Sequence, residues 1–333
     1  KAAGWSGAYD NFGNSWIRLE SHEFGHMFAM EHTFNGTGSS CTSNIADTTA
    51  YEIGSGTTIM SYQGLCQASN NIPGGNVADN YFHTISLQQA TKFIQNAATG
   101  GSCPTTISTG NTPPVVDANP CGLSSYTIPI GTAFRLRGSA TDANTDDVLT
   151  YCWEEYDEDG SAHPTQGFIG ATAAASTTAP LFRSFPPSFV PTRTIPFDGG
   201  ATSTFEALPT VARTVKFRLT ARDNNPNGGG IHGKLLTVTV SAAGPFAITS
   251  PNGGNSWASG SSQTVTWNNT GTTGFCTNVN IKLSLDGGLN FPYTLASATP
   301  NDGSQAVTIP AYIAASTTAR IMVECADNTC VVF

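Results

Sequence analysis

Apolar residues recur at helical spacing in the first third of the chain and at strand spacing in the rest. Residues 14–28 predict a helix, because a polar Asn-Ser pair can cap its start. Ile17, Phe24 and Phe28 would then fall on one apolar stripe. This helix carries the most informative polar residues of the chain.

A second helix is predicted between a capping box and a pair of glycines. Ser86 and Gln89 match the S-x-x-Q capping box, in which side chains satisfy the free N–H groups of the first turn. Gly100 and Gly101 favour the backbone that ends helices. The apolar face of this helix would consist of Leu87, Ala90, Phe93, Ile94 and Ala97.

The rest of the chain predicts two all-β modules. Residues 105–114 contain Thr, Ser, Gly and Pro with nothing to bury, which is typical of a linker. Residues 115–243 and 244–333 each contain short β-branched or aromatic runs bounded by turn residues, which favours Ig-like β-sandwiches. The first module has a long Pro- and Phe-rich interval that we interpret as an insertion. The chain stops at Phe333 inside what looks like a last strand, so the second module is expected to be cut short.

Composition narrows the class of protein. The net charge is −9, from 14 Lys and Arg against 23 Asp and Glu. This excess of negative charge does not favour binding to nucleic acid or to an anionic membrane. No apolar run is long enough for a transmembrane segment. Eight cysteines, none in a C-x-x-C pair, favour disulfides and a secreted or cell-surface protein.

The chemistry lies in the stretch His22-Glu23-Phe24-Gly25-His26, followed by His32. On a helix, His22 and His26 project from one face, where both can reach one Zn²⁺. If the chain turns back after the helix, His32 becomes a third ligand and a fourth position stays open for water. Glu23 is placed to act on that water. A structural zinc is the alternative, but such sites usually use several cysteines, and none is near.

This stretch resembles the zinc signature of the metzincin metallopeptidases, and Thr58-Ile59-Met60-Ser61-Tyr62 resembles their Met-turn. The nearest resemblance is to bacterial reprolysin-like secreted enzymes, in which residues 32–36 and 79–83 fall in similar order. It implies that residues 1–104 are the C-terminal part of an α+β catalytic domain. Met60 would form a floor under the histidines, and Tyr62 would reach the metal or the oxyanion, unless it is an ordinary packed tyrosine.

The resemblance also implies features outside the motif. It places a disulfide between Cys41 and Cys66, and it implies an upstream sheet, so an N-terminal fragment of the same protein is an expected partner. Ala29 stands where the family usually has glycine. If the backbone there is left-handed, alanine costs about 1 kcal/mol.

Acidic turns in the first module suggest Ca²⁺, which prefers oxygen ligands. They resemble the calcium-binding turns of polycystic-kidney-disease-type and cadherin-like modules; solvated turns are the alternative. The candidate ligands are Asp142, Asn144, Asp146, Asp147 and Asp223. Two further disulfides, Cys121–Cys152 and Cys325–Cys330, are candidates that spacing alone cannot decide.

Two functions compete on these observations. The first is a secreted zinc endopeptidase that hydrolyses protein or peptide substrates, with the β-modules as accessory domains. The second is an extracellular adhesive or structural protein whose peptidase segment is incomplete or inactive. The presence of all three histidines, Glu23 and Met60 favours the enzyme.

Overall fold

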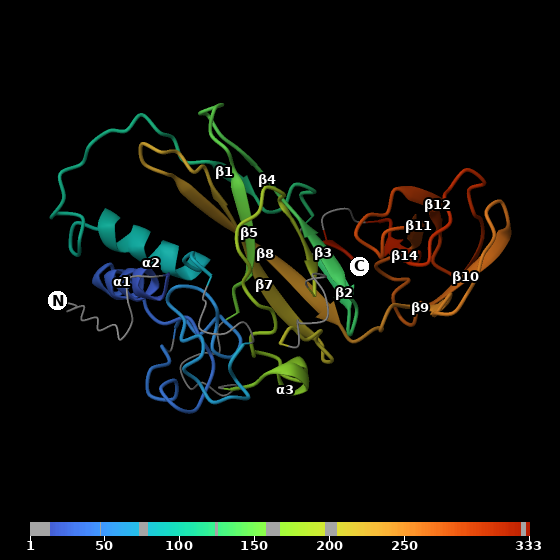
Figure 1. The fold of residues 1–333 in the computed structure, drawn as a ribbon, viewed down its shortest axis with the longest axis horizontal. Helices are drawn as coiled ribbons and strands as arrows, with labels where there is room; N and C mark the ends of the chain where they lie inside the picture. Colours follow the sequence, from blue (N-terminus) through green and yellow to red (C-terminus); the bar gives the residue numbers. More distant parts are fainter. Residues whose placement is uncertain are drawn as a thin grey trace.

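The computed structural model describes all of the chain except residues 1–13, 47, 73–78, 124–125, 158–166, 197–204 and 328–330. The described chain is mostly β-sheet with few helices (Figure 1). The helices are α1 (Asn14–Met27), α2 (Thr84–Gln95) and α3 (Gly170–Ala174). These helices are too short or too polar to cross a lipid bilayer.

Helix α2 starts three residues earlier than the capping box predicts. Its N-cap is His83, whose Nδ1 accepts from the N–H of Ile85 at 3.3 Å. The N–H of Thr84 donates to Glu154 Oε2 at 3.0 Å. Ser86 is fully buried and lies inside the first turn, so the predicted capping role is wrong. The carboxylate of Glu154, from the β-module, thus accepts from a free N–H group of the first turn of this helix. The local sequence could not indicate this contact.

The first β-module consists of two sheets packed face to face and a separate antiparallel pair formed by β1 and β4. One has the strand order β2-β8-β7-β5, with β2 parallel to β8, and the other has the order β15-β3-β6. Phe134 and Leu136 from one sheet meet Phe217 and Leu219 from the other in the core. The strands are β1 (Val115–Asp117), β2 (Tyr126–Pro129), β3 (Phe134–Arg137), β4 (Ser139–Thr141), β5 (Thr150–Glu155), β6 (Thr192–Ile195), β7 (Arg213–Arg222) and β8 (Ile231–Ser241).

The second module contains two three-stranded sheets, with orders β13-β10-β9 and β12-β11-β14. Val265 and Trp267 from one sheet and Ile281 and Val323 from the other belong to its core. The strands are β9 (Ala247–Ser250), β10 (Ser262–Asn268), β11 (Asn278–Ser284), β12 (Tyr293–Pro300), β13 (Ser304–Thr308), β14 (Arg320–Cys325) and β15 (Val331–Val332).

Two segments lie elsewhere than the sequence indicates. Strand β15 does not complete the second module; it pairs antiparallel with β3 of the first, placing Val331 opposite Leu136. The interval interpreted as an insertion supplies β6, which also pairs with β3, and the buried Leu181 and Phe182. Both segments are therefore part of the first module's core.

The helical segment packs on the four-stranded sheet of the first module, where α2 lies beside β5 (Figure 1). Tyr81 Oη donates to Ser184 Oγ at 2.6 Å, and that hydroxyl donates to Glu154 Oε1 at 2.5 Å. Ile53 and Ile72 of the same segment join the sandwich core. By contrast, the apolar side chains Ile17, Phe24 and Met27 on α1 are exposed, as is Phe28 directly after it, so the apolar stripe of this helix faces away from the sheet.

Candidate metal centre

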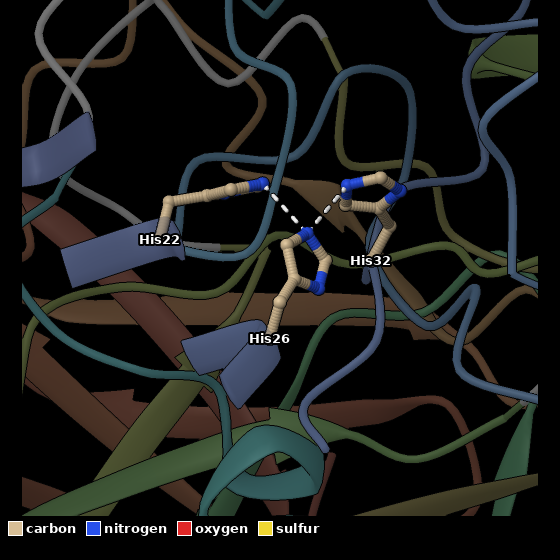
Figure 2. A group of neighbouring side chains, drawn as sticks. All are labelled: His22, His26 and His32. Carbon is tan, nitrogen blue, oxygen red and sulfur yellow. Dashed lines mark hydrogen bonds between the residues drawn. The ribbon is translucent and has the colours of Figure 1, made fainter. Parts of the chain in front are cut away.

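Three histidine side chains converge at the end of α1 (Figure 2). His22 and His26 come from successive turns of the helix, and His32 comes from the segment after it. The Nε2 atom of His26 lies 3.1 Å from that of His22 and 3.2 Å from that of His32. Zn–N bonds of ~2.1 Å at tetrahedral angles would set such nitrogens ~3.4 Å apart. The spacing fits three ligands of one ion.

The outer nitrogens of the three rings determine their tautomers. Each Nδ1 faces a backbone carbonyl oxygen: Ile59 at 2.8 Å for His22, Met30 at 2.8 Å for His26, and Asn44 at 2.6 Å for His32. A carbonyl only accepts hydrogen bonds, so each neutral ring carries its proton on Nδ1. Three Nε2 lone pairs then face one another with no proton between them. A cation between them would satisfy all three lone pairs, so the residues fit a metal.

Burial keeps two of these rings neutral. Desolvation lowers the pKa of His22 to about 4, although its bond to the Ile59 carbonyl opposes the shift. Desolvation also lowers the pKa of His32 to about 4, against the bond to Asn44. Both imidazoles are uncharged near neutral pH, which is the form that binds metal.

The helix ends in a Schellman motif that turns the chain back toward His32. The N–H of Met30 donates to the carbonyl of Gly25 at 3.0 Å, and that of Ala29 donates to His26 at 3.0 Å. Ala29 occupies the left-handed position of this motif, with φ of 61°. The strain that the sequence suggested for this alanine is therefore present.

Met60 lies beneath the histidine helix and is fully buried. A Cβ on Gly25 would stand 2.4 Å from Met60 Sδ, so only glycine lets the helix approach the methionine this closely. The neighbouring Ile59 carbonyl holds His22. The turn containing Met60 therefore contacts the histidine helix in two ways: the Met60 side chain packs against it, and the Ile59 carbonyl accepts from His22.

Tyr62 lies beside two of the three rings, and Glu23 acts on Tyr62 electrostatically. The Tyr62 ring centroid is 4.5 Å from that of His32 and 5.8 Å from that of His22. Burial raises the pKa of Tyr62, and the negative charge of Glu23 raises it further. Tyr62 is thus a neutral phenol within electrostatic reach of the Glu23 carboxylate.

Glu52 is a buried carboxylate of the site that the sequence did not identify. Its Oε1 accepts from the hydroxyls of Thr33, at 2.6 Å, and Thr58. Its Oε2 accepts from the N–H groups of Thr57, at 2.8 Å, and Thr58, at 3.2 Å. Glu52 therefore joins the segment after His32 to the segment before Met60. A lone glutamate between polar residues carries no sequence signal for this role.

The structure brings three of the five calcium candidates together. Oxygens of Asp142, Asp147 and Asp223 lie within 4.8 Å of one another, whereas Asp146 is outside the group. Asn144 Oδ1 accepts from a backbone N–H at 2.9 Å. Although burial opposes it, hydrogen bonds from Asn111, among others, lower the pKa of Asp223. Protein donors thus already bond to oxygens of the cluster and stabilise the charge of Asp223, and calcium remains a prediction.

The disulfides differ in part from expectation. Cys41 and Cys66 are bonded, as the resemblance implied. Cys121–Cys152 is wrong, because Cys121 is bonded elsewhere and the Cys152 thiol is free, buried and directed at the Phe185 carbonyl. Cys325–Cys330 is also wrong. Cys330 lies outside the described residues, but Cys325 is bonded to Cys276, because β11 and β14 are antiparallel neighbours and place these residues together.

Comparisons with known proteins leave the identity of the site open. No family model and no curated protein matches the chain. Among solved structures, the chain is similar to fibronectin(III)-like modules of Clostridium thermocellum CbhA, at 12% identity, over 63% of this chain and 84% of that one. The TM-score is 0.20, a value too low to support any inference about fold or function.

Proposed function

We propose that this protein is an extracellular zinc-dependent endopeptidase. The observation that carries the proposal is the set of three inward-facing Nε2 lone pairs on His22, His26 and His32. Glu23, which follows His22 on the same helix, lies within electrostatic range of Tyr62 at this site. Structural zinc sites usually take four protein ligands. Among the described residues, the metal-ligating group at this site consists of three histidines and has no fourth protein ligand. Three protein ligands are the pattern of a catalytic zinc site.

The chemistry divides between the metal and the chain. His22, His26 and His32 would hold zinc, which when bound would supply Lewis-acid chemistry for the peptide carbonyl and would lower the pKa of water at the site to about 7. Glu23 takes a proton from the attacking water as the new C–O bond forms. It then delivers that proton to the departing amine as the C–N bond breaks.

Tyr62 adds a hydrogen-bond donor at the same place. Its pKa is raised by burial and by Glu23, so it keeps its phenolic proton at neutral pH. A protonated phenol can donate to the oxyanion that develops on the substrate carbonyl. We assign it this role rather than that of a packing residue, because its ring lies against His32.

The same proposal accounts for the exposed apolar side of α1. Ile17 and Phe24 are 63% and 54% exposed, beside the exposed Met27 and Phe28. We assign this side to the upstream part of a catalytic domain, whose apolar surface would cover it.

The test uses the natural gene product and one matched pair of variants. We expect one zinc per chain by elemental analysis and casein cleavage that a chelator abolishes. Glu23→Gln should retain zinc and lose cleavage, whereas Glu31→Gln, an exposed glutamate in the same segment, should retain both. Zinc-free protein, or equal cleavage by the two variants, would refute the proposal.

The competing function is extracellular adhesion or structural support by the β-modules. It is favoured by the large share of the chain in residues 115–333, which are mostly strand and loop. The same experiment separates the two functions, because an adhesive protein would lack chelator-sensitive cleavage at every length of the gene product.

A further inference from the structure

A wide groove lies at the junction of the two β-modules, and none of the three clustered histidines lines it. Its volume is about 1040 Å³. On one side it is lined by β3 and β6 of the first module. On the other it is lined by the start of β14, by Lys282 of β11 and by the turn 287–291. In Figure 1, β3 and β14 face each other across the junction of the modules.

The groove is cationic although the protein is acidic. Five of the 14 lysines and arginines line it, in a chain with a net charge of −9. None of the groove's lining residues, all within the described part of the chain, is an aspartate or a glutamate. The cationic residues are Arg135, Arg137, Arg193, Lys282 and Arg320. This concentration of one charge favours an anionic occupant.

Within the described part of the chain, carboxylates neutralise two of these cations and not the other three. Arg193 bonds to Glu206 at 2.6 Å, and Lys282 forms an ion pair with Glu324. Arg135 lies 3.8 Å from a methionine sulfur, and Arg320 donates to the carbonyl of its neighbour. Arg137 has no acidic partner among the described residues. The unmatched charges therefore come from both modules.

The free strand edges beside the groove favour an anionic peptide over an anionic glycan. Strands β6 and β14 each lie at an edge of their sheet, and within the described chain no further strand pairs with either. Arg320 to Met322, at the start of β14, line the groove. An edge strand keeps one row of N–H and C=O groups free, and an extended peptide can pair with that row. A glycan has no matching row of amides.

The side chains agree with a strand-like ligand. Phe134 and Leu136 point into the core, so Arg135 and Arg137 project from the opposite face of β3. They stand opposite Thr194 and Thr192 of β6 in the sheet register. Their spacing of two residues matches the spacing of side chains on one face of an extended peptide.

We propose that this groove binds an extended acidic segment of another protein. The arginines receive carboxylates at alternate positions of the segment, and the edge of β14 or β6 pairs with its backbone. This binding depends neither on the metal nor on the proposed peptidase activity. It would hold a second protein at the junction of the modules.

The test measures binding of a fluorescein-labelled peptide that alternates glutamate with threonine. The peptide has about eight residues, which span about 25 Å when extended. We expect saturable binding by fluorescence anisotropy, weakened by salt and absent for the lysine–threonine peptide. A version N-methylated at alternate residues should bind more weakly, because it cannot pair with a strand edge. Oligomers of galacturonic acid are the competing probe, because they represent an anionic glycan in place of an anionic peptide.

Matched variants locate the site. Arg137→Gln with Arg320→Gln should weaken binding by about tenfold or more, as expected for the loss of two charge pairs. Lys92→Gln with Lys234→Gln removes the same charge outside the groove and should leave the affinity unchanged. Thermal melting checks that both proteins remain folded. Equal affinities of the two variants, unaltered binding after N-methylation, or tighter binding of the galacturonate oligomers would each overturn the proposal.

Discussion

Replacement of Glu52 by glutamine tests how the metal centre is held in shape. The Glu52 carboxylate is 2% exposed and accepts four hydrogen bonds, from Thr33, Thr57 and twice from Thr58. In Glu52→Gln, the amide oxygen can still accept from the two backbone N–H groups, while the NH₂ group donates to the two threonine hydroxyls. The bonds persist but lose the charge of their acceptor.

The size of the destabilisation follows from the loss of the carboxylate charge. A hydrogen bond to a charged group contributes about 1.5–3 kcal/mol, and a neutral one about 0.5–1.5 kcal/mol. Four such differences, less the relief of no longer burying a charge, give a destabilisation of about 2–3 kcal/mol. Because Glu52 joins the segment of His32 to that of Met60, the zinc dissociation constant should rise about tenfold, at the lower end for residues that orient ligands.

The assay is a zinc titration against a chromophoric chelator, together with urea unfolding of the metal-free protein. Glu31→Gln is the control, because it makes the same chemical change at an exposed site. A dissociation constant within a factor of about two of the unsubstituted protein, which is less than 0.5 kcal/mol, would show that Glu52 does not position the ligands.

Three further predictions concern strain, pH and calcium. Ala29→Gly should stabilise the protein by about 0.5–1 kcal/mol in urea unfolding, because Ala29 has φ of 61° and an exposed side chain; destabilisation would contradict this. Burial raises the pKa of Asp157 to about 6, so the folded state binds its proton more tightly than the unfolded state. Stability should therefore fall as pH rises from about 4 to about 6, by about 2–3 kcal/mol, and Asp157→Asn should flatten that slope. If the dependence of stability on pH were the same in Asp157→Asn, the assignment to Asp157 would be wrong. If Asp142, Asp147 and Asp223 bind calcium, a chelator selective for Ca²⁺ should lower the melting temperature, and Asp147→Asn should remove that effect.

The sequence by itself determined the local parts of this protein. Two histidines four residues apart share a helix face whatever surrounds them, and alternating apolar residues specify strands such as β3 and β7 with their buried faces. These features depend on interactions within a few residues, which the chain order already contains. The left-handed backbone at Ala29 was expected only through the resemblance, in which glycine usually stands at this position.

Tertiary structure alone decided what depends on distant residues. The Nδ1 bonds that orient His22 and His32, the clamp by Glu52 and the capping of α2 by Glu154 all join segments far apart in the chain. The disulfide partner of Cys325, the pairing of β15 with β3 and the cationic groove have the same origin. Such contacts are set by which sheets pack together, and the spacing of residues along the chain does not encode that choice.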